Sequence, residues 1–172
     1  MEFSNNQIQI DNLPNLDAVE LKPVSKHYKN IIILNSTLSY TIIFGLLMTG
    51  KYTISEPTFQ QYFILILVIV VILCLSHLII SLLAFKKLKY AIREHDVIYA
   101  KGLLIQSLTT VSISRIQHTE TSRSWLARQF QLATLNIYTA GESGSDLSIK
   151  GLPQEEAKQV NDFLSEKVNG NN

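Results

Sequence analysis

Disulfides, clustered metal ligands and an excess of charge are all missing from this sequence. Its 172 residues contain a single cysteine, and 15 Lys+Arg face 14 Asp+Glu, which leaves a net charge of +1. A lone cysteine, Cys74, excludes an internal disulfide. The balanced charge gives no global case for a nucleic-acid partner. The four histidines are scattered without the spacing of metal ligands, so we expect no metal and no cofactor.

Charge is also missing from two long runs in the first half of the chain. Residues 62–85 contain no Asp, Glu, Lys or Arg, and as a helix they would measure about 36 Å at 1.5 Å per residue. A bilayer core is about 30 Å thick, so this run predicts a transmembrane helix with some tilt. The alternative is a buried helix of a soluble protein, but a domain of this size rarely buries a helix that is apolar on every face.

The earlier uncharged run, residues 31–49, is more polar because its middle holds one asparagine and several hydroxyl groups. Beside an apolar partner helix it is expected to form the other span of a hairpin over residues 30–85. The connection at 50–61 contains Gly50 and Pro57, which suits a turn between antiparallel spans.

Basic residues gather on one side of this hairpin. Lysines precede the first span and follow the second, whereas the connection between the spans holds only Lys51. Lys and Arg favour the cytoplasmic side, so both termini are expected inside, with residues 1–29 as a cytoplasmic segment. About thirty mostly polar residues precede the first span, which argues against a cleaved signal peptide. The predicted membrane-surface basic cluster consists of Lys86, Lys87, Lys89 and Arg93.

Polar residues within the two spans are predicted to face each other. In antiparallel helices Asn35 lies at the depth of Ser81, and Ser39 lies at the depth of His77. Each pair is spaced i, i+4 on its own helix, so the four side chains predict one interhelical polar seam. Such contacts contribute about 0.6 kcal/mol each. A proton relay through His77 is the alternative, but the spans hold no carboxylate to accept a proton.

The second half of the chain has the periodicity of short strands. Residues 88–104 predict a hairpin, and 141–146 predict a loop. Pro153 begins a predicted helix with acidic residues in its first turn and Lys167 in its last. Antiparallel strands capped by one amphipathic helix predict a small barrel or bent sheet with a helical plug. The other strand-like segments are 108–114, 116–122, 133–140 and 147–151.

Four short motifs follow one another in this half. They are SRIQH at 114–118, R-x-F-x-LATL at 128–135, TAG at 139–141 and I-x-GL at 149–152. With the two spans, they resemble the YdbS-like family of bacterial membrane proteins that carry a pleckstrin-homology-like (PH-like) domain. The resemblance covers about residues 31–168. It departs at Gln131, where the family commonly has a glycine, so a turn that depends on glycine is expected to be altered there.

The resemblance implies a PH-like fold at 86–168, with residues 169–172 as a tail. That fold is a strongly bent, seven-stranded sandwich or barrel closed by a C-terminal helix, here joined to a membrane α-helical hairpin. The resemblance also implies a multi-pass protein of the bacterial inner membrane without catalytic activity. Family members often occur beside a larger PH-containing membrane partner, and some are linked to resistance against antimicrobial peptides. The implied partners are the bilayer and either a related PH-domain membrane protein or a second copy of the chain.

Residues 114–130 contain the strongest candidates for a functional site. His118 and Glu120 share one strand face, but no elbow motif, phosphate loop or metal spacing supports catalysis, and antiparallel strands show such alternating polar residues to water. A rim that binds phosphate or carboxylate groups, or a membrane surface, is the other functional interpretation. The alternative is that Trp125 and Phe130 are core anchors among solvated arginines. The predicted rim consists of Arg115, Gln117, Arg123, Trp125 and Arg128.

Taken together, these patterns predict a non-enzymatic membrane protein that presents a cytoplasmic PH-like module for protein–protein assembly. The first alternative is that the module binds anionic lipid headgroups through the basic cluster. The second is a transporter subunit, or an enzyme that uses His77 or the His118 and Glu120 pair.

Overall fold

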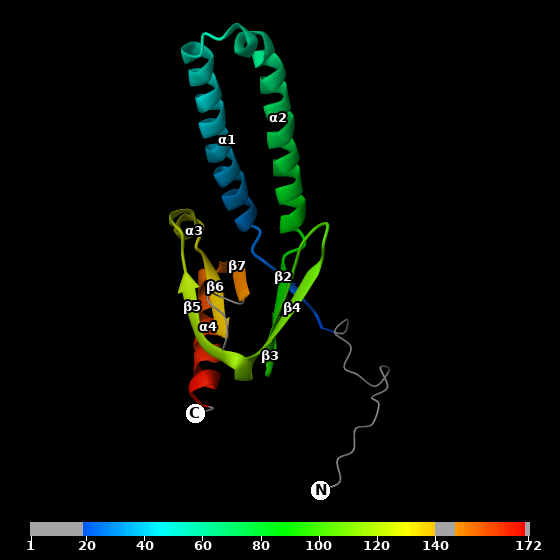
Figure 1. The fold of residues 1–172 in the computed structure, drawn as a ribbon. Coiled ribbons are helices and arrows are strands. Elements are labelled where there is room, and N and C mark those ends of the chain that lie inside the picture. The colour runs from blue at the N-terminus through cyan, green and yellow to red at the C-terminus, as the bar shows by residue number, and fades with distance from the viewer. Residues whose placement is uncertain (1–18, 140–146, 171–172) are drawn as a thin grey trace.

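Two long helices project side by side from one end of a small β-rich domain (Figure 1). The computed structural model describes residues 19–139 and 147–170; most of the predicted segment 1–29 and the predicted loop 141–146 lie outside them. The helices are α1, Tyr28–Thr53, and α2, Pro57–Phe85. Both are long and apolar enough to cross a membrane. Their buried side chains are few: Ile31 and Ser36 in α1, and Phe63 in α2. Helices of this composition with so little protein contact suit a lipid environment.

Both helices extend beyond the runs predicted from composition, so the connection shrinks from 50–61 to residues 54–56. Pro57 begins α2, where its missing N–H is not needed. The side-chain amide of Gln60 donates to the carbonyls of Lys51 and Ile54, each at 2.7 Å. These bonds satisfy carbonyls at the end of α1 and allow the polar residues of the predicted loop to be helical.

The domain consists of two antiparallel sheets that share one hydrophobic core. The first sheet has the strand order β1-β2-β3-β4, and the second has the order β5-β6-β7. This arrangement confirms the predicted bent β architecture. The strands are β1 Lys22–Pro23, β2 Lys89–Ile92, β3 Asp96–Lys101, β4 Ser107–Ser112, β5 Ile116–Ser122, β6 Leu132–Thr139 and β7 Leu147–Pro153.

Three short or terminal helices complete the domain. They are the 3-10 turn η3 at Ile113–Arg115, α3 at Trp125–Gln129 and α4 at Gln154–Asn169. α4 packs against β5 and β6, and its Ala157 and Leu164 are fully buried in the core. The predicted C-terminal helical plug is therefore confirmed, although it includes Asn169 of the predicted tail.

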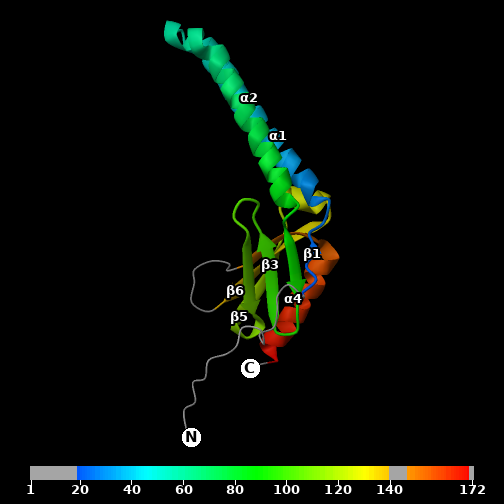
Figure 2. The same cartoon turned by 90° about the vertical axis from the view of Figure 1, so that its right-hand side faces the viewer.

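The first strand of the domain precedes the membrane helices, and the sequence did not predict it. Lys22 pairs with Tyr90 and Pro23 pairs with Lys89, as Figure 2 shows for β1 beside the sheet. Val24, which follows this strand, is 5% exposed within the core. The domain is therefore not confined to 86–168, because α1 and α2 are inserted between its first two strands.

A polar contact ties β1 to the last helix. Lys22 Nζ lies 2.8 and 2.9 Å from the two carboxylate oxygens of Glu156, and the hydroxyl of Tyr90 donates to the same carboxylate. Burial, followed by the hydrogen bond and charge of Glu156, raises the pKa of Tyr90. The Tyr90 hydroxyl therefore remains a neutral donor at physiological pH. Together these contacts hold β1, β2 and α4.

A glycine allows the base of the membrane helices to pack against β7. Gly151 has a φ of 78°, and a Cβ at this position would lie 2.6 Å from Cγ of Tyr28. The Gly151 carbonyl accepts a hydrogen bond from the Ser25 N–H at 3.0 Å. The Tyr28 ring in turn lies 6.3 Å, between ring centroids, from that of Phe85 at the end of α2. Both helices are therefore fixed to the domain at their base.

Gln131 adopts a left-handed backbone conformation at the position where the resembling family commonly has a glycine. Its φ is 52°, a left-handed value that no other non-glycine residue adopts in the described part of the chain. Its N–H donates to the Arg128 carbonyl at 3.2 Å, and its carbonyl accepts from the Gln154 N–H at 2.9 Å. A turn that usually needs glycine is therefore formed here by glutamine. The left-handed conformation of Gln131 has a steric cost of about 1–2 kcal/mol.

Replacing Gln131 with glycine is expected to stabilise the protein. The gain is about 0.5–1 kcal/mol, because relief of the left-handed strain exceeds the extra chain entropy of glycine. Gln131→Val should destabilise it, since a β-branched side chain tolerates positive φ poorly. Denaturant unfolding of the full chain in detergent measures both changes. A destabilised Gln131→Gly variant beside an unchanged Gln131→Val variant would contradict this account.

Candidate functional site

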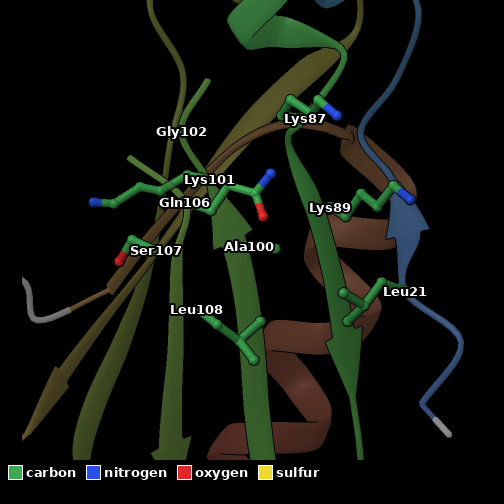
Figure 3. Close-up of a pocket in the computed structure, with 9 residues that line it drawn as sticks. All are labelled: Leu21, Lys87, Lys89, Ala100, Lys101, Gly102, Gln106, Ser107 and Leu108. Atoms are coloured by element: carbon green, nitrogen blue, oxygen red, sulfur yellow. The ribbon is translucent and has the colours of Figure 1, made fainter. Parts of the chain in front are cut away.

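A groove with a volume of about 450 Å³ lies on the face of the first sheet that points away from the core (Figure 3). Tyr90 and Tyr99 point into the core, so their strand neighbours Lys89 and Ala100 point to the opposite face. We call this feature the lysine groove. Its lining residues are Leu21, Lys87, Lys89, Ala100, Lys101, Gly102, Gln106, Ser107 and Leu108.

The strand register builds the lysine groove from segments that are distant in the sequence. Ala100 pairs with Lys89 on one side and with Leu108 on the other, so a lysine flanks a small apolar floor. In Figure 3 the side chains of Lys87 and Lys89 extend to one side and that of Lys101 extends to the other, with the Gln106 amide between them. None of the described lining residues is acidic. Cationic rims around an apolar floor suit an anionic group attached to an apolar body.

Only part of the predicted basic cluster belongs to this groove. Lys87 and Lys89 line it, and Lys86 is exposed next to them in the sequence. β2 runs away from the membrane helices, so the β2–β3 turn lies at the opposite end of the domain (Figure 1). Arg93 belongs to that turn and forms a bidentate pair with the Asp96 carboxylate. Sequence reasoning missed Lys101, which pairing with Ser107 brings to the groove.

β5 divides the predicted arginine rim into two parts. The η3 turn that contains Arg115 lies far from the membrane helices, because the Ile113 N–H donates to His95 of the β2–β3 turn at 2.9 Å. β5 then returns toward those helices, and its 7 residues extend about 20 Å. Arg115 and Gln117 therefore lie apart from the remaining rim residues, Arg123, Trp125 and Arg128.

The part of the rim around α3 lies beside α1. Trp125 and Leu126 share a hollow with Leu34 and Leu38 of α1. Trp125 is 66% exposed, so it is not the core anchor that the alternative interpretation required. Phe130, by contrast, is partly buried and packs against a small hydrophobic cluster.

His118 and Glu120 lie on an exposed face of the second sheet and contact their neighbours. The His118 ring stacks on Tyr138 with 4.1 Å between ring centroids, and the Tyr138 hydroxyl donates to Glu120 at 3.1 Å. The hydrogen bond to Glu120 is the main reason why the pKa of Tyr138 is raised, and loss of hydration is the second. Within the described ranges, no three His, Cys, Asp or Glu side chains gather as a metal site would require.

A polar contact joins the two membrane helices, but its partner on α1 is Tyr40. The Tyr40 hydroxyl donates to the Cys74 carbonyl at 2.8 Å and lies 2.7 Å from Nδ1 of His77. Ser81 Oγ lies 3.5 Å from Nε2 of the same ring. Asn35 lines a shallow hollow with His77 and Ser81, as the predicted seam requires. Ser39 was expected to face His77, yet the longer reach of the tyrosine fills that place.

Comparisons with known proteins agree with this architecture. The family described as "Bacterial PH domain" matches residues 33–168. The "UPF0699 transmembrane protein YdbS" of Bacillus subtilis (strain 168) is 32% identical over 87 residues, which is 51% of this chain and 53% of that protein. The chain thus spans about half the length of this curated relative in the alignment. No solved structure matches the chain.

The arrangement of the helices predicts a selective crosslink. In a Cys74→Ser background, the pair Asn35→Cys and Ser81→Cys should crosslink within one chain, because both positions line the same hollow. Leu38→Cys with Ser81→Cys should crosslink less, since Leu38 lines the hollow that contains Trp125 but, unlike Asn35, does not line the hollow that contains Ser81. Gel mobility after brief oxidation of native membranes measures both pairs, and equal crosslinking would contradict the proposed helix rotation.

Proposed function

This chain belongs to the bacterial PH domain family, and from that premise we propose that its domain binds an anionic lipid headgroup in the lysine groove. It is a transmembrane PH-domain protein of the YdbS family. The observation that carries the proposal is that Lys87, Lys89 and Lys101 all line one groove, whose described lining contains no acidic residue. A binding role without catalysis is part of the proposal.

The position of the lysine groove favours a lipid as the anionic group. Lys87 follows the last residue of α2, Phe85, by two positions, so the groove lies close to the level of the headgroups. Each basic residue near an anionic membrane surface contributes about 1 kcal/mol. The apolar floor of Leu21, Ala100 and Leu108 suits the part of a lipid next to its phosphate.

The proposal includes the orientation of the protein in a bacterial cell membrane. Lysines flank the hairpin at the end that carries the domain, whereas Lys51 lies at the turn between the helices. By the positive-inside rule, this bias supports cytoplasmic termini and a cytoplasmic domain. The lysine groove would then face the leaflet in which anionic lipids give a negative surface potential.

Neutralising the groove is expected to weaken lipid binding. Lys87→Gln with Lys89→Gln should raise the Kd for dioctanoyl phosphatidylglycerol about 10- to 30-fold, since two contacts of about 1 kcal/mol are lost. Titration of the purified full chain in detergent measures this change. The matched control is Lys158→Gln with Lys167→Gln on α4, which alters net charge equally but leaves the groove intact. If both double variants weaken lipid binding equally, the effect comes from net charge alone and a specific site is refuted.

A second candidate function, assembly with another membrane protein, is favoured by the edge of β4. Within the described residues, β4 ends its sheet and pairs only with β3. Its sequence, SLTTVS, contains neither the charges nor the proline with which proteins usually protect an edge strand. A partner strand could add to this edge through backbone hydrogen bonds. A related PH-domain membrane protein or a second copy of this chain would supply that strand.

A lysine on the open edge should interfere with such an assembly. Thr110→Lys places a charge on an exposed position of β4, whereas the control Thr121→Lys places the same charge on β5, which packs against α4. Crosslinking in native membranes, followed by extraction in gentle detergent, should show a larger complex that Thr110→Lys diminishes and Thr121→Lys leaves intact. If the unmodified chain forms no complex larger than the monomer, this second candidate is excluded.

A further inference from the structure

Two exposed apolar projections stand on the membrane-facing end of the domain. One is the β3–β4 loop, in which Leu104 and Ile105 are 89% and 84% exposed. The other is α3, in which Trp125 is 66% exposed. In two perpendicular views, both projections reach the level at which α1 and α2 leave the domain (Figures 1 and 2). Figure 1 shows them on opposite sides of the hairpin base.

The β3–β4 loop has a defined conformation that depends on a glycine. Gly102 has a φ of 101°, and a Cβ at this position would lie 1.9 Å from the carbonyl oxygen of Ile105. Residues 102 and 105 therefore approach each other closely, and the loop between the strands is tight. Leu104 and Ile105 lie within this turn, and both side chains are exposed.

α3 is also fixed by specific contacts, and its tryptophan is exposed. The Ser124 hydroxyl caps the helix by accepting from the Ala127 N–H at 3.2 Å. Ala127 and Leu126 pack in a cluster with Ile31 at the base of α1. This packing fixes α3 against the membrane hairpin and leaves Trp125 exposed next to it.

The chemistry of both projections matches the boundary between headgroups and acyl chains. Exposed apolar side chains that adjoin one another in a patch, as Leu104 and Ile105 do, mark a surface that contacts a partner or a membrane. Tryptophan is enriched at the membrane interface, where its apolar ring and polar N–H are both accommodated. Basic residues adjoin each projection in the sequence, Lys101 at the loop and Arg123 and Arg128 around α3, which complements anionic headgroups.

We propose that Leu104, Ile105 and Trp125 insert into the interfacial layer of the same bilayer that α1 and α2 cross. The domain would then rest on the membrane at three places: the base of the hairpin, the β3–β4 loop and α3. This seating goes beyond the proposed lipid site, because it requires no specific headgroup. It also turns the lysine groove, which is bordered by Gly102 and Gln106 of the same loop, toward the membrane surface.

Trp125 provides a direct test because it is the only tryptophan of the chain. The full protein is reconstituted into vesicles of phosphatidylcholine and phosphatidylglycerol whose acyl chains are brominated close to the glycerol. We expect these lipids to reduce Trp125 emission relative to unbrominated vesicles, whereas aqueous iodide should have little effect. If brominated lipid does not reduce Trp125 emission, the proposal is overturned. This includes the case in which iodide also fails to quench, because a protein partner then covers the ring.

The β3–β4 loop is tested separately with a nitroxide label. In a Cys74→Ser background, Leu104→Cys is labelled and compared with Leu46→Cys on a lipid-exposed part of α1 and Glu166→Cys on α4. We expect the label at 104 to collide with oxygen more than with a water-soluble nickel complex, as the label at 46 does. If its accessibility equals that at 166, the loop lies in water and the proposal fails.

These results are distinguishable from those of the lysine groove. The Lys87→Gln and Lys89→Gln double variant should retain Trp125 quenching by brominated lipid, because neither lysine belongs to α3. Loss of that quenching in the double variant would show that seating depends on the groove and would overturn the independent insertion proposed here. Failure of the lipid titration with intact quenching would refute only the headgroup site.

Discussion

The pairing of β1 with β2 is the constraint on which the rest of the structure depends. These strands lie on either side of the membrane helices in the sequence, yet Lys22 pairs with Tyr90 and Pro23 pairs with Lys89. The chain must therefore return to the side of the membrane from which it departed, and two antiparallel spans are the simplest way to do so. The same-side arrangement of both flanks thus follows from β pairing, independently of any charge bias.

This insertion also determines how closely the domain approaches the bilayer. Residues 24–27 connect β1 to α1, and residues 86–88 connect α2 to β2. Connections of three or four extended residues reach about 10–14 Å at most, so the first sheet cannot move far from the ends of the helices. The contacts of Tyr28 with Gly151 and Phe85 restrict it further. The lysine groove, α3 and the β3–β4 loop consequently lie at the end of the domain nearest the membrane.

Local patterns predicted most elements, whereas the spatial relations of the candidate site needed the structure. Charge-free runs and alternating residues identified the two spans, most strands and the C-terminal helix. β1 gave no such signal, because a strand of two residues that includes Pro23 has no periodicity. Arg115 and Arg123 are near in sequence, but an extended strand separates them. Lys101 gave no such signal, because strand alternation separates it from the face of Lys89 and Ala100, and it reaches the groove only at the end of β3.

The hairpin owes its cohesion more to its base than to contacts within the membrane. The four threonine hydroxyls of α1 need no partner helix, since each donates to a carbonyl of its own helix at 2.9 Å. In the described residues, the side-chain hydrogen bonds between α1 and α2 involve Tyr40 and, next to the turn of the hairpin, Gln60. Such bonds contribute about 0.6 kcal/mol each in membrane proteins. That is little for helices of this length, so the pairing of β1 with β2 and the aromatic contact at the base hold α1 and α2 together where lipid cannot compete.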